Sequence, residues 1–330
     1  MRTGTQNYST GIFRHPVWVS VLALTAAVVW GWAYPLIKMG FEEFRIEPSM
    51  TGSKMLFAGI RFAMSGTIIL AAARIAGRSF HVRPQAADTP QKQNRPWGVA
   101  MFVLVFSLLN TTLHYTFFYI GLSYSQGARA AILNSMSVFT VVILACLFFK
   151  SDRMTFRKAM GVTIGIAGLI ILDGDALVGE ASHYSPGELF GDLMIILNAL
   201  CSAFASLMTR GLARRMDVFV GTGYSLAIGG ALIIIPGIMM GGTLPHVTMW
   251  GLTILMLLIA ISTIGFTLYN RLLATNPIGR IAIYNSLIPV VGAISSCWCL
   301  GEPFYWKYAI AGSLAAAGIY LINKGQTDKR

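Results

Sequence analysis

The chain has 330 residues, of which 55% are hydrophobic and 12% are charged, whereas a soluble globular domain carries about 25% charged residues. This composition excludes an ordinary soluble protein and indicates an integral membrane protein. The formal net charge of +12 would suit a nucleic-acid-binding protein, but the positions of the basic residues, described below, argue against that class.

Apolar stretches of about twenty residues, the length that a helix needs to cross a bilayer, recur along the whole chain. They predict an all-α protein with ten transmembrane helices. The predicted spans cover residues 17–37, 51–75, 97–119, 124–149, 154–172, 187–209, 219–240, 248–269, 281–300 and 305–322.

The basic residues divide unevenly between the two sides that these spans define. The loops of one side hold 19 Lys and Arg residues, and the loops of the other side hold Arg45, Lys54 and Lys307. This bias is the positive-inside pattern. It predicts a multi-pass protein of the plasma (cell inner) membrane with both termini in the cytoplasm, and it explains the net charge without nucleic acid as a partner.

Signatures of catalysis and of bound metals are missing from the sequence. The four cysteines, Cys146, Cys201, Cys297 and Cys299, all fall inside predicted spans, so their spacing supports neither a disulfide framework nor a zinc site. The sequence has no P-loop, HExxH or GxSxG motif and no acidic pair within the spans. We therefore expect no cofactor, no metal and no enzymatic activity.

The first predicted span has an aromatic middle that contains a proline, Trp30-Gly31-Trp32-Ala33-Tyr34-Pro35. A proline inside a helix frees the carbonyl four residues before it, here that of Gly31. At membrane depth a free carbonyl is tolerated where protein or a cavity covers it. The stretch is therefore either a kinked packing helix or a wall of a substrate cavity.

The second span carries Arg61 near the centre of the bilayer. A charge at this depth costs at least ~2.5–3.5 kcal/mol and indicates a functional residue by default. No Asp or Glu lies at a comparable depth in any predicted span. Arg61 is expected to pair either with carbonyl and hydroxyl oxygens of the protein or with the carboxylate of a substrate.

Polar residues in the third span recur at helical spacing. Ser107, Asn110, Thr111 and His114 are expected on one helical face, with Tyr115 and Phe118 beside them. Such a face should point into the bundle. His114 is expected either as a hydrogen-bonded neutral imidazole or as a proton relay, and Asp192 in the sixth span is a weaker candidate for proton coupling.

Three later spans offer further polar and aromatic residues. The sixth carries a second stripe, Asn198, Ser202, Ser206 and Thr209. The eighth contributes Ser262, Thr263, Phe266, Tyr269 and Asn270. The ninth contributes Tyr284, Asn285 and Ser286, and Pro289 frees the carbonyl of Asn285.

The two halves of the chain repeat one another. RAAILNS at residues 129–135 recurs as RIAIYNS at residues 280–286, so that a shift of 151 carries Asn134 onto Asn285 and Arg129 onto Arg280. We expect one five-helix repeat in residues 1–172 and a second in residues 187–330, joined by an outer loop, residues 173–186. Because five is odd, the second repeat should be inverted, with a binding site near the midplane between the repeats.

The sequence resembles the EamA-type transporters of the drug/metabolite transporter superfamily over nearly its whole length. The resemblance rests on WGWAYPLIK in the first span, AGIRF at residues 58–62 and NSLIPVVGAISSCWCLGEP at residues 285–303. It implies a transporter with a central cavity, and it implies Trp32, Tyr34, Asn110, His114, Asn134, Asn198, Tyr269 and Asn285 as lining residues. The family's Gly-Glu pair appears as Gly301-Glu302, whereas the first half has Lys150-Ser151-Asp152, which leaves open whether Asp152 replaces the glutamate.

Three functions are consistent with these patterns. The first is a secondary transporter, by the resemblance often an exporter, of a small neutral or zwitterionic metabolite such as an amino acid. The second is a carrier of organic cations held over aromatic rings, and the third, remote, is an intramembrane enzyme that modifies lipids. The expected partners are a small-molecule substrate and membrane lipid, with a homodimer as a further option. The candidate substrate-binding residues are Trp30, Trp32, Tyr34, Arg61, Asn110, His114, Tyr115, Phe118, Asn134, Asn198, Ser202, Phe266, Tyr269, Tyr284 and Asn285.

Overall fold

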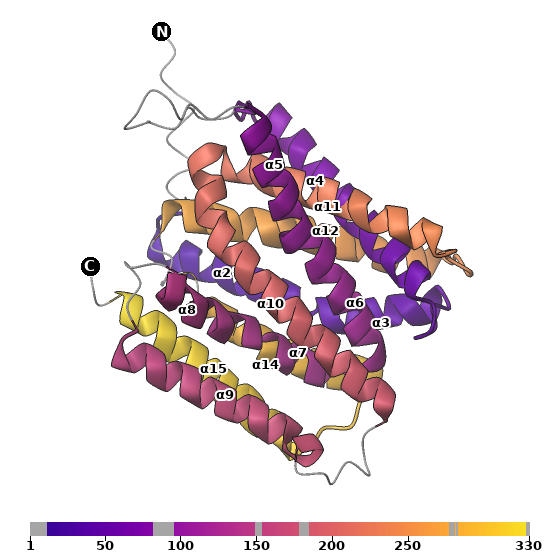
Figure 1. Ribbon diagram of the computed structural model, residues 1–330, viewed down its shortest axis with the longest axis vertical. Helices are drawn as coiled ribbons and strands as arrows, with labels where there is room; N and C mark the ends of the chain where they lie inside the picture. The colour runs from indigo at the N-terminus through magenta and orange to yellow at the C-terminus, as the bar shows by residue number, and fades with distance from the viewer. Residues whose placement is uncertain are drawn as a thin grey trace.

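The computed structural model describes residues 12–81, 96–148, 154–177, 185–276, 281 and 283–327. Every regular element in these residues is helical (Figure 1). In chain order they are α2 (Pro16–Gly31), α3 (Ala33–Glu43), α4 (Thr51–Ile75), α5 (Pro96–Ser107), η2 (Leu108–Leu113), α6 (His114–Tyr124), α7 (Gly127–Asn134), α8 (Met136–Phe148), α9 (Phe156–Leu177), α10 (Pro186–Arg215), α11 (Val218–Met239), α12 (Met249–Thr275), η4 (Ile283–Ser286), α14 (Leu287–Leu300) and α15 (Trp306–Thr327). Arg280 and Asp152, which the sequence singled out, lie outside the described residues.

The helices are long and apolar enough for a membrane protein. Within the described part of the chain, seven helical segments could each cross a bilayer: Pro16–Glu43, Thr51–Ile75, Gly98–Tyr124, Gly127–Phe148, Pro186–Thr209, Val218–Met239 and Met249–Leu272. Leu287–Leu300 and Trp306–Ile322 are shorter apolar helices. The chain is therefore a multi-pass membrane protein.

The first span is broken where the proline predicts. α2 ends at Gly31 and α3 begins at Ala33, and the bond from Leu36 N to Trp32 O is long, 3.4 Å. The hydroxyl of Ser295 on α14 lies 3.5 Å from the Gly31 carbonyl that Pro35 frees. A side chain from the second half of the chain thus approaches the freed carbonyl of the buried Gly31 in the first half.

The third span does not keep one α-helical face, and in this respect the prediction from spacing was wrong. Residues 108–113 form a π-helix, in which the hydrogen bonds join residues five apart, so the side chains turn out of phase with an α-helix. Asn110 and Thr111 therefore contact Ser225 on α11. His114 instead contacts the backbone of Asn198 on α10.

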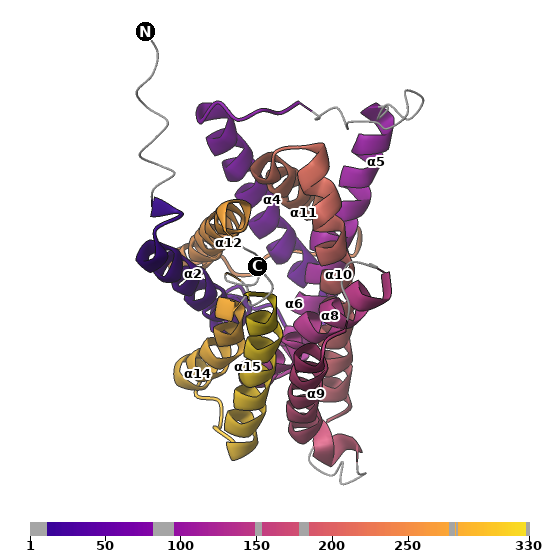
Figure 2. The ribbon, with the colours of Figure 1, turned by 90° about the vertical axis from the view of Figure 1, so that its left-hand side faces the viewer.

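The helices pack as pairs drawn from different halves of the sequence. α4 packs along α11, and α9 packs along α15. In Figure 2 the α4–α11 pair lies in the upper part of the molecule and the α9–α15 pair in the lower part, with α2, α12 and α14 on the left and α5 and α10 on the right. α3, α6 and α7 pack against one another.

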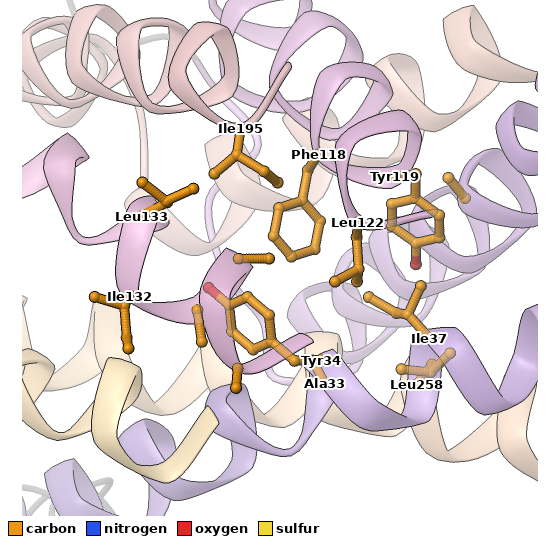
Figure 3. Close-up of a cluster of buried hydrophobic side chains, with 14 of the residues drawn as sticks. Ala33, Tyr34, Ile37, Phe118, Tyr119, Leu122, Ile132, Leu133, Ile195 and Leu258 are labelled. Atoms are coloured by element: carbon orange, nitrogen blue, oxygen red, sulfur yellow. The ribbon is translucent and has the colours of Figure 1, made fainter. Parts of the chain in front are cut away.

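The largest buried cluster fills the place where α3, α6, α7 and α10 meet. Phe118, Leu122 and Ile195 pack around Tyr34 and Ile37 there (Figure 3). The cluster includes Ile132 and Leu133, the two buried residues of α7 that come directly before Asn134.

The α4–α11 pair depends on glycines that let two backbones touch. A Cβ at Gly66 would lie 2.7 Å from both the carbonyl oxygen of Gly223 and the Cα of Ala227. Gly66→Ala is expected to destabilise the protein by about 1–3 kcal/mol, because the helices must move apart. The thermal unfolding midpoint in detergent measures this, and Gly98→Ala is the matched control because a Cβ there meets open space. Equal midpoints for the two variants would contradict the packing argument.

Candidate substrate-binding site

A chain of hydrogen-bonded polar side chains lies where α3, α6, α7 and α10 meet. Asn134 donates from Nδ2 to the Tyr34 hydroxyl at 2.8 Å, and Asn198 donates from Nδ2 to Asn134 Oδ1 at 2.6 Å. The His114 ring nitrogen Nδ1 lies 3.3 Å from the backbone carbonyl of Asn198. Because a carbonyl oxygen accepts, His114 carries a hydrogen on Nδ1 in this contact.

The hydrogen-bonded series Tyr34–Asn134–Asn198 is incomplete at both ends. Asn198 Oδ1 is buried and has no hydrogen-bond partner among the described residues, although buried polar atoms are normally paired. The Tyr34 hydroxyl accepts from Asn134, and no acceptor for its own proton occurs among the described residues. The site therefore presents one unused acceptor and one unused donor.

Aromatic rings border the polar chain. Tyr34 packs edge-on against Phe118 with ring centroids 5.3 Å apart. Tyr115 lies between His114, at 4.3 Å, and Phe62, at 3.9 Å. The polar groups are thus enclosed by apolar surface, which strengthens their hydrogen bonds relative to water.

A second polar and aromatic group lies where α2, α12 and η4 meet. Asn285 donates to the Tyr269 hydroxyl at 2.8 Å, and Trp30 packs edge-on against Tyr269 and Phe266 at 5.1 and 5.5 Å. Tyr284 donates to Ser20 on α2 at 2.6 Å. The structure therefore places Trp30, Phe266, Tyr269, Tyr284 and Asn285 together, in a group separate from the Tyr34–Asn134–Asn198 chain.

Arg61 is occupied by groups of the protein. Its Nε donates to the Leu258 carbonyl at 3.1 Å and to Ser262 Oγ at 2.8 Å, and its Nη1 donates to the Tyr119 hydroxyl at 2.9 Å. The residue is only 4% exposed. Of the two roles considered for Arg61, the contacts correspond to pairing with carbonyl and hydroxyl oxygens.

A substitution tests this role. Arg61→Met is expected to lower the thermal unfolding midpoint, because hydrogen bonds to a charged group contribute about 1.5–3 kcal/mol each. Arg74→Met is the control, since Arg74 is an exposed residue in the last turn of the same helix. If both variants unfold at the same temperature, the contacts of Arg61 do not stabilise the bundle.

Other predicted site residues lie apart from these groups. Trp32 packs on the exposed Trp298, with ring centroids 6.0 Å apart. Asn110 donates to Ser225 on α11. Ser202 is half-buried, whereas Ser206 is exposed and bonds its own helix, so the stripe of the sixth span contacts other helices through Asn198.

Two ion pairs close to the site were not predicted. Lys38 pairs with Glu302 at 2.8 Å, and Arg129 pairs with Asp192 at 2.7 Å. Each partner is 63 or more residues from the other, so no local spacing connects them. The available signal was the positions of the four residues, all at the ends of predicted spans on one side.

The model of the EamA-like transporter family matches residues 17–172 and 189–324. The chain belongs to this family. EamA-like proteins are transporters rather than enzymes, so the chain is a membrane transporter, as the polar site enclosed by membrane-spanning helices suggests.

Known proteins that resemble this EamA-like chain are also named as transporters. An uncharacterized transporter of Archaeoglobus fulgidus is 24% identical, with 93% of this chain and 97% of that protein covered. A probable amino-acid metabolite efflux pump of Escherichia coli is 22% identical, with 91% of this chain and 93% of that protein covered. Its counterpart in Salmonella typhimurium is 24% identical, with the same coverage.

A solved crystal structure shares the fold of this EamA-like transporter. Its TM-score is 0.58 at 17% sequence identity, and the match covers 93% of this chain and 98% of the other. At this identity the likeness concerns the arrangement of the helices alone.

Proposed function

We propose that this EamA-like transporter exports a small neutral or zwitterionic metabolite, such as an amino acid, across the cell membrane by alternating access. In this proposal ten spans form two inverted five-helix repeats, residues 1–172 and 187–330, with both termini in the cytoplasm. The substrate binds near the midplane, at the polar groups between the repeats.

The observation that carries the proposal is the unfinished hydrogen bonding of the Tyr34–Asn134–Asn198 chain. A ligand that donates to Asn198 Oδ1 and accepts from the Tyr34 hydroxyl would complete it. The ammonium group of an amino acid donates, its carboxylate group accepts, and both groups are attached to the same carbon. The buried Arg61 is held by Ser262 and Tyr119, which leaves the neutral amides and hydroxyls to bind the substrate.

The packing of the helices supports the inverted arrangement. α4 and α11, which are counterparts in the two repeats, pack on one another, and so do the counterparts α9 and α15. Each repeat also places its asparagine beside an interruption of the helix: α7 ends at Asn134, and Asn285 lies in the 3-10 helix before α14. Both asparagines donate to a tyrosine hydroxyl.

A second candidate function, transport of an organic cation, is favoured by one observation. Trp30, Phe266 and Tyr269 form a three-ring group in which each ring is partly exposed. Ring faces attract cations, with about 2 kcal/mol for a desolvated pair.

A binding panel distinguishes the two candidates. The purified protein in detergent is heated with alanine, threonine, leucine or phenylalanine, with the corresponding amino-acid amides, and with tetraethylammonium. The proposal predicts that at least one amino acid raises the unfolding midpoint and that its amide, which lacks the carboxylate, raises it less. A shift with tetraethylammonium and with none of the amino acids would overturn the proposal in favour of the cation carrier.

A further inference from the structure

Helix α7 connects the polar site to one end of the bundle. It spans eight residues, Gly127–Asn134, or about 12 Å at helical rise. Its last residue, Asn134, forms hydrogen bonds with Tyr34 and Asn198. The helix is interrupted at Ser135, and α8 begins at the next residue. α7 packs against α3, α10 and α14, so it is a short rigid segment with the candidate site at its C-terminal end.

The first residues of α7 are held by a carboxylate from the other half of the chain. Gly127 N donates to Glu302 Oε1 at 2.8 Å, and Ala128 N donates to Glu302 Oε2 at 3.1 Å. The N-cap residue Gln126 makes no side-chain cap, so Glu302 satisfies N–H groups that a helix start leaves unpaired. A negative charge at this position is also favoured by the helix dipole.

Glu302 ties α7 to α3 as well. Lys38 donates to Glu302 Oε1 at 2.8 Å and to the Ser125 carbonyl at 3.1 Å. A surface hollow of about 430 Å³ is lined by Lys38, Phe41, Arg45 and Ser123, among others. The side chains of Lys38 and Glu302 are 23% and 9% exposed, so the pair lies close to the surface of the protein.

A second ion pair holds α7 to α10. Arg129 donates to Asp192 Oδ2 at 2.7 Å, and Ser125 donates to Asp192 Oδ1 at 2.9 Å. Asp192 is 4% exposed. Asp192 lies on α10, and Glu302 lies between α14 and α15. Both carboxylates that hold α7 therefore belong to other parts of the protein.

The matching positions of the other end lack these acids. The shift of 151 that relates the repeats maps Glu302 onto Ser151, and the shift of 172 that maps Lys38 onto Arg210 maps Asp192 onto Ser20. Ser20 accepts from Tyr284 rather than forming an ion pair. The outer end of the proposed topology, whose loops hold few basic residues, is therefore fastened by charge. At the inner end serines occupy the two matching positions, and Asp152 stands next to Ser151.

We propose that α7 is the outer gate of the transport path and that Glu302 is the positioning residue that holds it shut, by capping α7 and binding Lys38. Movement of α7 about the break at Ser135 would then open the outer end and displace Asn134 in one step. The inference goes beyond the proposed substrate, because it concerns the closure of the path and applies whatever the path carries.

The test measures reaction of a buried thiol from outside. In a variant whose four native cysteines are replaced by serine, Ala130→Cys places a thiol on α7 at a position that is 0% exposed. A membrane-impermeant, negatively charged thiosulfonate is added to intact cells. Glu302→Gln is expected to raise the rate of modification about tenfold, since hydrogen bonds to a charged acceptor are the stronger ones.

Two further variants distinguish loss of the cap on α7 from loss of a negative charge near it. Glu42→Gln removes an exposed carboxylate from the end of α3 beside the same hollow and should leave the rate unchanged. The exchange Lys38→Glu with Glu302→Lys restores an ion pair but cannot accept from Gly127 and Ala128, so modification should stay fast. If Glu302→Gln is modified as slowly as the parent, or if the exchange restores slow modification, the capping role is overturned. If Glu302→Gln does not reach the membrane, Lys38→Met removes the other contact of Glu302 and leaves the cap intact. A rate equal to that of the parent would overturn the part of the proposal that assigns a role to Lys38.

Discussion

Replacement of Asn198 by alanine is expected to reduce transport about 10- to 100-fold. The substitution removes the donor to Asn134 Oδ1 and the acceptor that the substrate would use. A buried polar group left unpaired costs about 1–3 kcal/mol, and each 1.36 kcal/mol corresponds to about a tenfold change in rate. The measurement is efflux of the substrate from cells that overproduce the protein.

The control for this variant lies on the same helix. Ser206 is exposed and bonds the carbonyl of Ser202 within α10, so Ser206→Ala should transport at the rate of the unmodified protein. Both variants should elute from size-exclusion chromatography as the unmodified protein does. Normal efflux by Asn198→Ala would show that the Tyr34–Asn134–Asn198 chain does not contact the substrate.

The largest effect on stability is expected at Arg129. Its Nε and Nη2 both lie 2.7 Å from Asp192 Oδ2, and the two side chains are each 5% exposed. Arg129→Met leaves a buried carboxylate without its cation, which costs about 3–5 kcal/mol. The unfolding midpoint in detergent should fall accordingly, and the added change Asp192→Asn should recover most of the loss, because it removes the stranded charge.

Arg78 provides the comparison for a weak ion pair. It lies 3.8 Å from Asp217, and its side chain is 34% exposed, so Arg78→Met is expected to change stability by about 0–1 kcal/mol. The account of Arg129 fails if Arg129→Met is as stable as Arg78→Met, or if the double variant is no more stable than Arg129→Met alone.

Two features that the sequence predicted and the structure contains depend on neighbouring residues, and a repeat drew attention to two further residues. Membrane composition follows from the apolar stretches, and the break at Trp32 follows from Pro35 three residues later. The RAAILNS repeat identified Asn134 and Asn285, which bond tyrosines in the two groups. The first two features follow from local chemical rules, whereas the two asparagines follow from comparison of the two halves of the sequence.

Features that depend on helices distant in sequence were not predicted. The π-helix at residues 108–113 changes the phase of the third span, and no residue type in that stretch requires it. Trp32 was expected at the site but packs on Trp298, a residue of the second half of the chain. The pairs Lys38–Glu302 and Arg129–Asp192 join residues that only the packing of α3, α7 and α10 brings together.

The central claim, that the chain moves a small polar metabolite through the Tyr34–Asn134–Asn198 site, is tested most directly by counterflow in proteoliposomes. Vesicles containing the purified protein are loaded with the unlabelled amino acid that gives the largest thermal shift, and uptake of the same amino acid in radiolabelled form is followed. The account predicts transient accumulation with the unmodified protein and with Ser206→Ala, and none with Asn198→Ala or in vesicles without protein. Uptake equal to that of protein-free vesicles would contradict it, and so would uptake by Asn198→Ala equal to that of the unmodified protein.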